Sequence, residues 1–354
     1  MKLDVRPHAW TDLSPTELRD EIARLTGKAF HGRQVLRWIY ERGVSDPADM
    51  TDLPKGLRQQ LGHARPFETL QQRHVHDSND GTRKFLFALH DGQLIETVSI
   101  PDGERLTVCF STQVGCAMAC RFCASGQSGL SRNLSPGEIV EQVLRVQRDS
   151  DRRITHLVAM GIGEPMANYD ALLVAVRTLT DPEAFGLGAR RVTVSTVGLA
   201  GPIRRLAEEK LSINLALSLH APNDELRREL IPTAKQPLSE ILGAVRYYQQ
   251  RTGREATLEY VQLPEVNDGP EHIIQLADRL RGWRCTVNVI PFNEVEGAPY
   301  RSPSPKEVIR FHRALIAAGI KVKVRRRRGD SAAAACGQLR AVVAGRQSTV
   351  GGQQ

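Results

Sequence analysis

Beyond residue 101 the chain alternates short segments rich in Val, Ile, Leu or Thr with longer segments that we expect to be helical. Six such pairs follow one another. The predicted strands lie near 105–111, 154–160, 190–196, 213–219, 256–262 and 284–290, and the predicted helices near 136–148, 169–179, 201–209, 238–250, 270–281 and 304–318. Repeated strand–helix units predict an α/β fold with a parallel sheet and helices outside it. Six units are too few for an eight-stranded barrel, so we expect an open (β/α)6 partial barrel with its chemistry at the C-terminal ends of the strands.

The segment before residue 101 has a different pattern. Ser14 is a suitable N-cap and Pro15 a suitable first residue for a helix. A second helix is predicted from Gly32 to Arg42. Two apolar segments, 83–89 and 93–100, flank His90-Asp91-Gly92 and predict a β-hairpin.

These patterns divide the chain into four parts. We expect a helical module at 1–70, a β-hairpin region at 71–101, and the partial barrel with a C-terminal segment at 102–340. A last strand is predicted at 320–325. The tail at 341–354 is rich in Gly, Ser and Gln and is expected to be disordered.

Composition narrows the class of protein. The chain has 354 residues, of which 41% are hydrophobic and 25% charged, as in soluble globular proteins. It has no apolar run long enough to cross a bilayer and no signal-peptide pattern, so we expect a cytoplasmic protein without a membrane partner. Its six cysteines are too few and too clustered for a disulfide scaffold.

The most specific chemical motif is a C-x3-C-x2-C run formed by Cys116, Cys120 and Cys123. Three close thiolates can ligate three irons of a 4Fe-4S cluster and leave the fourth iron without a protein ligand. The alternatives are a structural zinc site, which would need a fourth ligand and usually paired C-x2-C arms, or three reduced thiols. The spacing resembles the signature of radical S-adenosylmethionine (SAM) enzymes, in which SAM fills the open position and is cleaved to a 5'-deoxyadenosyl radical.

Polar motifs follow the predicted strands at the edge where such a barrel would bind SAM. A carboxylate at a strand end can hold the SAM amino group, and a strand-end Ser-Leu-His suits a SAM contact. Plain turns and a core histidine are the simpler interpretations. The candidate SAM contacts are Gly163, Glu164, Ser195, Ser218, Leu219, His220 and Asn293.

Taken together, the motifs closely resemble those of the RlmN/Cfr family of radical SAM methyltransferases, which modify an adenine of large-subunit ribosomal RNA. The resemblance covers nearly the whole chain. The matching stretches include Arg37-Trp38-Ile39-Tyr40, Gln113-Val114-Gly115-Cys116, Gly161-Ile162-Gly163-Glu164-Pro165, Ser218-Leu219-His220-Ala221-Pro222-Asn223-Asp224, and Ala335-Cys336-Gly337-Gln338-Leu339.

The resemblance implies three catalytic residues. Cys336 would receive a methyl group from one SAM, and a radical formed from a second SAM would activate that group for addition to the adenine. Glu96 would remove the ring proton, and Cys109 would release the product by forming a transient disulfide with Cys336. Without the resemblance, Cys109 and Cys336 would be interpreted as small buried residues and Glu96 as an exposed acid.

The family also implies partners and a choice of product. We expect 23S ribosomal RNA as substrate, transfer RNA as a second candidate, an electron donor such as flavodoxin or ferredoxin, and a monomer. The 321–340 segment has seven basic residues and one acid, which favours a polyanion but also fits a solvated strand end. Ala221-Pro222-Asn223-Asp224 resembles the branch that methylates carbon 2. A Cfr-like carbon 8 enzyme, a small-molecule radical SAM enzyme and a non-catalytic iron-sulfur RNA-binding protein are the alternatives.

Overall fold

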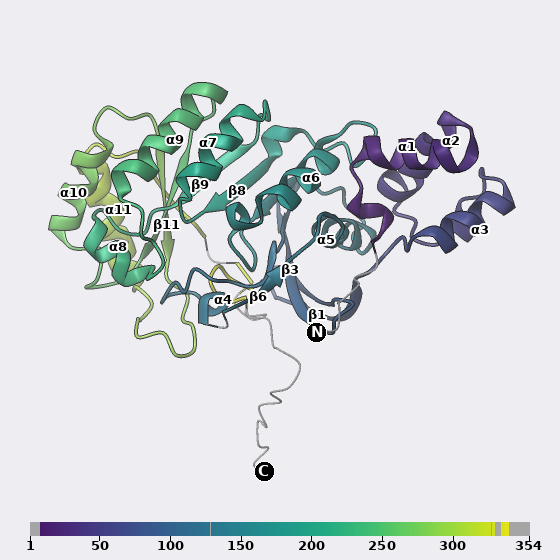
Figure 1. Ribbon diagram of the computed structural model, residues 1–354. Coiled ribbons are helices and arrows are strands. Elements are labelled where there is room, and N and C mark those ends of the chain that lie inside the picture. Colours follow the sequence, from purple (N-terminus) through teal and green to yellow (C-terminus); the bar gives the residue numbers. More distant parts are fainter. Residues whose placement is uncertain (1–7, 128, 327, 330–333, 340–354) are drawn as a thin grey trace, which may run out of the picture.

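A single ten-stranded sheet runs through the molecule (Figure 1). The structure is a computed structural model that describes residues 8–127, 129–326, 328–329 and 334–339. The tail at 341–354, predicted to be disordered, lies outside the described residues, as do Arg327, Asp330 and Arg340 of the basic segment. Among the described helices, none combines the length and apolar character needed to span a bilayer.

The parallel part of the sheet confirms the expected α/β partial barrel. Its strands, in spatial order, are β4 (Arg105–Cys109), β7 (His156–Ala159), β8 (Val192–Thr196), β9 (Asn214–Ser218), β10 (Thr257–Gln262), β11 (Thr286–Pro291) and β12 (Val322–Val324). The helices between them are α5 (Pro136–Arg148), α6 (Tyr169–Thr180), α7 (Ala200–Glu208), α9 (Leu238–Thr252), α10 (Pro270–Leu280) and α11 (Pro305–Ala317). Among the strands that the structure describes, β12 is the last of the sheet and does not pair back to β4, so this part of the barrel is open.

Alternation along the strands separates a packed outer face from a hollow interior. In β8, Val192 and Val194 belong to the main apolar core, whereas Thr193 and Ser195 line cavities inside the barrel. In β10, Tyr260 lies in the core and Glu259 inside the barrel. The helices pack against the outer apolar face, and the polar side chains are left facing the interior.

The N-terminal segment is helical, as expected, and lies to one side of the barrel (Figure 1). It contains α1 (Pro15–Thr26), α2 (Ala29–Leu36), a π-helical turn (Arg37–Glu41) and α3 (Lys55–Ala64), with short 3-10 turns at Trp10–Asp12 and Pro47–Asp49. The Ser14 hydroxyl caps α1 by accepting from the Glu17 N–H. The second helix was predicted to begin at Gly32, but it begins at Ala29, and its second half is π-helical.

Buried polar contacts fix this helical segment to α5 of the barrel. The Gly137 N–H donates to Asp12 at 2.9 Å. The Glu141 carboxylate accepts from the Thr11 hydroxyl at 2.7 Å and from the Leu70 N–H at 2.9 Å. Such satisfied buried groups specify one docking geometry for the segment.

Three antiparallel strands extend the sheet beyond β4. They are β1 (Gln71–Asp77), β2 (Arg83–Ala88) and β3 (Leu94–Asp102), and β2 and β3 form the predicted hairpin. β1 was not predicted. Leu86 pairs with Glu96, and Val98 pairs with Cys109 of β4. Because side chains two residues apart share a face, Glu96 lies on the same face of the sheet as Cys109.

A small separate sheet begins and ends the loop that contains the three clustered cysteines. It consists of β5 (Gln113–Gly115) and β6 (Leu130–Asn133), with the short helix α4 (Ala124–Gln127) between them. Gly115 has a φ of +75° and lies so close to the Gly129 carbonyl that a side chain would collide with it. One further short helix, α8 (Asp224–Leu230), follows β9.

Candidate active site

A cavity of about 170 Å³ lies at the C-terminal ends of the parallel strands, beside the cysteine loop. It brings together most of the site residues predicted from the sequence. Those lining it are Cys116, Cys120, Cys123, Gly163, Glu164, Ser195, Ser218, His220, Asn293 and Cys336. Leu219, Glu96 and Cys109 are not in this lining.

The three cysteines form one end of the cavity. Hydrogen bonds from the Cys116 N–H to Gly129 and from the Arg121 N–H to Leu230, at 2.8 and 3.0 Å, hold their loop in place. Burial raises the pKa of the Cys116 thiol to about 12 and raises the pKa of Cys120 and of Cys123 as well. Ligand thiols must be deprotonated, so this site needs a bound cation to hold three thiolates.

The donor set fits a 4Fe-4S cluster in which three of the irons are each bound by a different cysteine. The charges of Cys116 and Cys123 act on Cys120, so the three thiols are neighbours. Among the described residues, no three His, Cys, Asp or Glu side chains converge on one position that could hold a single ion. A cubane does not require convergence, because each thiolate ligates its own iron.

Glu164 and Gly163 form the adjoining wall of the cavity. The Glu164 carboxylate accepts hydrogen bonds from the Met166 and Val197 N–H groups at 2.9 and 2.8 Å. Burial raises the pKa of Glu164, while these hydrogen bonds oppose the rise. Gly163 has a φ of +110°, and a Cβ there would lie 2.6 Å from the Gln113 side chain. The backbone can therefore approach the cavity here only as glycine.

The Ser218-Leu219-His220 segment divides between the cavity and the core. The Ser218 hydroxyl lies 3.3 Å from the Ser195 hydroxyl of the neighbouring strand, and both line the cavity. Leu219 is fully buried, and its side chain belongs to the main apolar core. Any contact of Leu219 with a cofactor would therefore involve its backbone.

His220 presents a neutral imidazole to the cavity. Its Nδ1 accepts from the Val261 N–H at 3.0 Å, so the neutral ring has its proton on Nε2. Burial, together with the charge of Arg227, lowers the pKa of His220 to about 3. The ring meets Phe122 of the cysteine loop edge-on, with centroids 4.7 Å apart. His220 therefore links the end of β9 to that loop through a ring contact, and its Nε2–H is a donor at the cavity.

The segment that contains Cys336 is fastened to the cysteine loop by backbone contacts. The Ala124 N–H donates to Gly337 at 2.8 Å, and the Ser125 hydroxyl donates to Leu339 at 2.6 Å. From the other side, the Asn293 amide donates to the Cys336 carbonyl at 3.1 Å. These contacts place Cys336 at the mouth of the cavity that the three cysteines line.

Cys109 and Cys336 are neighbours, although they are far apart in sequence. Burial raises the pKa of Cys109 to about 12, and the charge of Cys336 adds to the rise, while Arg325 opposes it. Cys109 also packs in a small apolar cluster with Ala334 and Leu339, on either side of Cys336. The fold thus brings together the two thiols for which the family resemblance implies methyl transfer and product release.

Comparison with known proteins agrees with this arrangement. A family model described as "Radical SAM superfamily" matches residues 110–277, and one described as "Ribosomal RNA large subunit methyltransferase N-terminal domain" matches residues 10–65. A relative from Gloeobacter violaceus, named a dual-specificity RNA methyltransferase RlmN, is 48% identical over 92% of this chain and 93% of its own length. The chain belongs to the RlmN family of radical SAM RNA methyltransferases.

Further relatives and a solved structure extend this RlmN-family match. A relative of the same name from Geobacillus kaustophilus is 46% identical over 93% of this chain and 91% of its own length. The crystal structure of a radical SAM methyltransferase from Sphaerobacter thermophilus is 45% identical, with a TM-score of 0.91 over 94% of this chain and 99% of that one. As a radical SAM enzyme, this RlmN-family protein uses a 4Fe-4S cluster and SAM.

Glu96, the third residue of the expected RlmN-type chemistry, is buried on β3. Only 5% of its surface is exposed, although an acid in a hairpin is usually exposed. Its carboxylate forms an ion pair with Lys84 at 3.0 Å, and an adjacent ammonium stabilises a carboxylate. Glu96 does not line either cavity inside the barrel, but it shares the sheet face of Cys109.

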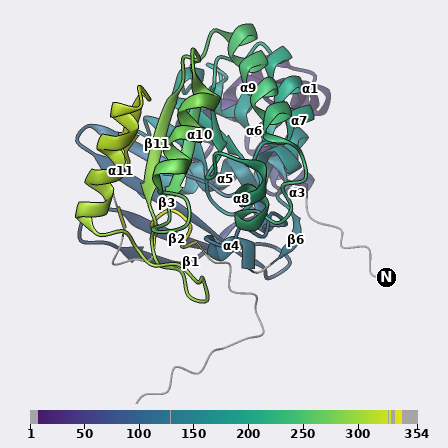
Figure 2. The ribbon, with the colours of Figure 1, turned by 90° about the vertical axis from the view of Figure 1, so that its left-hand side faces the viewer.

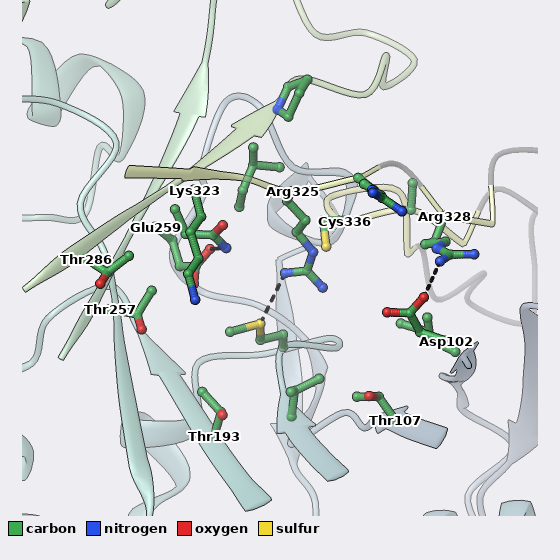
Figure 3. Close-up of a pocket in the computed structure, with 18 of the residues that line it drawn as sticks. Asp102, Thr107, Thr193, Thr257, Glu259, Thr286, Lys323, Arg325, Arg328 and Cys336 are labelled. Carbon is green, nitrogen blue, oxygen red and sulfur yellow. Dashed lines mark hydrogen bonds and ion pairs between the residues drawn. The ribbon is translucent and has the colours of Figure 1, made fainter. Parts of the chain in front are cut away.

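Glu259 was not predicted for this RlmN-family site, and Arg325 was predicted only as one of the basic residues of the 321–340 segment. A larger cavity of about 610 Å³ fills the barrel interior and also reaches Cys336 (Figure 3). Arg325 and Glu259 line both cavities. The charge of Cys336 raises the pKa of Arg325, and Glu259 and Cys109 add to that rise. The alternation of Lys321, Lys323 and Arg325 with two valines was visible in the sequence. In a strand, this alternation places the three basic side chains on one face.

Proposed function

We propose that this enzyme methylates carbon 2 of an adenine in 23S ribosomal RNA, and an adenine in transfer RNA, by way of a methyl group carried on Cys336. The observation that carries the proposal is the position of Cys336 at the cavity lined by the three clustered cysteines, next to Cys109. The name dual-specificity RNA methyltransferase, given to the relatives, supports two classes of RNA substrate.

In this proposal the chain's own residues hold both cofactors. Cys116, Cys120 and Cys123 ligate the cluster, and Gly163, Glu164, Ser195, Ser218, His220, Asn293 and the backbone of Leu219 contact SAM. When bound, the cluster and two SAM molecules per turnover supply one methyl group and one 5'-deoxyadenosyl radical. Apolar side chains line part of the cavity, and Asn293 holds the carbonyl of Cys336 beside it.

Three residues then handle the methyl group and one proton. The Cys336 thiolate takes the methyl group and becomes a thioether, through which the RNA becomes attached to the protein. Glu96, as a carboxylate paired with Lys84, removes the ring proton of the adenine. The Cys109 thiolate attacks the Cys336 sulfur, the bond between that sulfur and the RNA-bound carbon breaks, and this carbon takes up a proton to become the methyl group. A Cys109–Cys336 disulfide forms as the methylated RNA leaves, and an external reductant returns it to two thiols before the next turnover.

The charges around Arg325 favour this order of events. While Cys336 is a thiolate, its negative charge and Arg325 attract each other, and that charge helps to raise the pKa of Cys109. A thioether at Cys336 carries no charge. Methylation therefore removes one cause of the high pKa of Cys109 and leaves Arg325 to stabilise the Cys109 thiolate when it is needed.

We also propose the setting in which the enzyme works. Ribosomal and transfer RNA as substrates support a cytoplasmic location. The cluster needs an external electron for each cleavage of SAM, and flavodoxin or ferredoxin is proposed as the donor. The proposed active form is a monomer, because one chain supplies every residue of the proposed site.

The test is a product analysis with the anaerobically reconstituted enzyme. Wild-type protein, SAM, a reductant and ribosomal RNA lacking the modification should give 2-methyladenosine in the digested nucleosides by mass spectrometry. Cys336→Ala should cleave SAM but give no methylated adenosine. If the product is 8-methyladenosine instead, the enzyme methylates carbon 8 and the assignment to carbon 2 is wrong. SAM cleavage by the wild type without any methylated adenine would refute the RNA assignment.

A further inference from the structure

A pair of exposed histidines lies on β1, the outermost strand of the sheet. The rings of His74 and His76 meet edge-on, with centroids 4.1 Å apart, and both residues are exposed. Within the described residues β1 pairs with β2 on one side only, so its other edge is open to a partner. Figure 2 shows β1, β2 and β3 side by side.

Strand register places this pair on the same face as the proposed chemistry. His74 pairs with Leu86, which pairs with Glu96. The next row on the same face runs from His76 through Lys84 and Val98 to Cys109. Val75, between the histidines, points the other way and packs on the main core. Two rows of side chains therefore lead from Glu96 and Cys109 out to the histidines.

We propose that this histidine face, formed by His74, His76, Lys84 and Leu86, binds an unpaired nucleotide of the RNA next to the target adenine by stacking of its base. This inference rests on the proposed function, because it requires an RNA whose adenine reaches Glu96.

The chemistry of the face suits a single-stranded nucleotide. RNA bases that are read by proteins are mostly unpaired, and they stack on flat side chains, histidine among them. β1 is two strand spacings from β3, roughly 10 Å, which a nucleotide adjoining the target adenine can span. Leu86 offers an apolar surface between the histidines and Glu96, and the Lys84 ammonium beside it is paired with Glu96.

Stacking, rather than a fixed positive charge, is the contribution expected of His76. Burial, the neighbouring His74 and Lys84 lower the pKa of His76. The ring of His76 is therefore neutral at neutral pH. A neutral ring holds a base through its flat face, and phenylalanine can replace it in that role.

The test compares two double variants in the RNA methylation assay. His74→Ala with His76→Ala should raise the KM for RNA about tenfold, the cost of one lost base stack, and leave kcat within about twofold. His74→Phe with His76→Phe should restore a KM close to that of the wild type. His312→Ala, on α11 away from this face, is the matched control and should leave KM unchanged.

Two readouts without RNA show whether the variants keep the site intact. The mass of the intact protein should show Cys336 methylated to the same extent as in the wild type, and SAM cleavage without RNA should be equal. The inference would be overturned if the double alanine variant had the KM of the wild type. It would also be overturned if the double phenylalanine variant had a KM for RNA as high as that of the double alanine variant. Failure of the wild type to methylate RNA would instead refute the proposed function.

Discussion

The two groups of functional cysteines are organised in opposite ways. Cys116, Cys120 and Cys123 lie in one loop between the paired strands β5 and β6, so local sequence alone brings them together. Cys109 and Cys336 come from the first barrel strand and from the segment after the last one, and only the complete fold makes them neighbours. Local sequence thus brings the three clustered cysteines together, whereas the pair proposed to carry and release the methyl group depends on tertiary structure.

Each cysteine group also has its own arginine, and the two arginines differ: Arg227 is buried, whereas Arg325 is partly exposed. Arg227, near Cys120, is 2% exposed and donates to the carbonyls of Leu219 and Ser218 at 3.2 Å and to that of Val197. Burial lowers the pKa of Arg227 to about 10, whereas the Cys336 charge raises the pKa of Arg325. Arg227 therefore braces backbone around the cluster site, and Arg325 serves the thiol pair.

The largest loss of activity should come from replacing one of the three clustered cysteines. Cys120→Ala leaves two of the three thiolates, so the protein should lose bound iron, the visible absorbance of the cluster, SAM cleavage and all RNA methylation. Cys285→Ala, at a buried cysteine outside both groups, is the control and should keep all four. Wild-type SAM cleavage by Cys120→Ala would contradict the ligand assignment.

Breaking the thiol pair should stop turnover at a later stage. Cys109→Ala should still cleave SAM and methylate Cys336, but it should remain covalently attached to RNA after one turnover because nothing attacks the Cys336 sulfur. The attached RNA should appear as a slow band on a denaturing gel. The double variant with Cys336→Ala should show no such band. Multiple turnovers by Cys109→Ala would contradict the proposed release step.

The smallest expected effect comes from replacing Arg325, the arginine next to the thiol pair. Arg325→Met should slow methylation of Cys336 about tenfold, because the loss of one charge-assisted interaction costs on the order of 1.5 kcal/mol. Arg325→Lys keeps the charge and should slow it less. Iron content should be unchanged in both, since Arg325 serves the thiol pair. The measurement is a time course of intact-protein mass with SAM, and equal rates for the methionine and lysine variants would contradict a role for the charge.

Much of the fold could be predicted because its strands and helices have strong patterns. All six predicted strand–helix pairs are present, and most of their boundaries agree within two residues. β1 was missed because Gln71–Asp77 contains one apolar residue, Val75, and is held mainly by pairing with β2. The short α8 was missed because its N-cap, Asn223, and its first residue, Asp224, belong to a motif that was interpreted as a cofactor contact and a family signature.

The site was predictable where a motif and a strand end coincide, and less so elsewhere. Cys116, Cys120, Cys123, Gly163, Glu164 and His220 all line one cavity, as adjacent strand ends of a parallel sheet should. The Leu219 side chain lies in the core instead, because the alternation of β9 turns it away from the cavity. The proximity of Arg325 to Cys109 and Met160 could not be predicted, because these two residues lie far away in the chain.

The hydrogen bonds between the cysteine loop and the Cys336 segment also set an order of events during synthesis. The ribosome makes residues 116–125 long before it makes Gly337 and Leu339, whose carbonyls accept from Ala124 and Ser125. Until those late residues emerge, the Ala124 N–H and the Ser125 hydroxyl have neither of these acceptors. The loop thus completes its native contacts only after nearly the whole chain has been translated, so iron loaded earlier would meet an unfinished site.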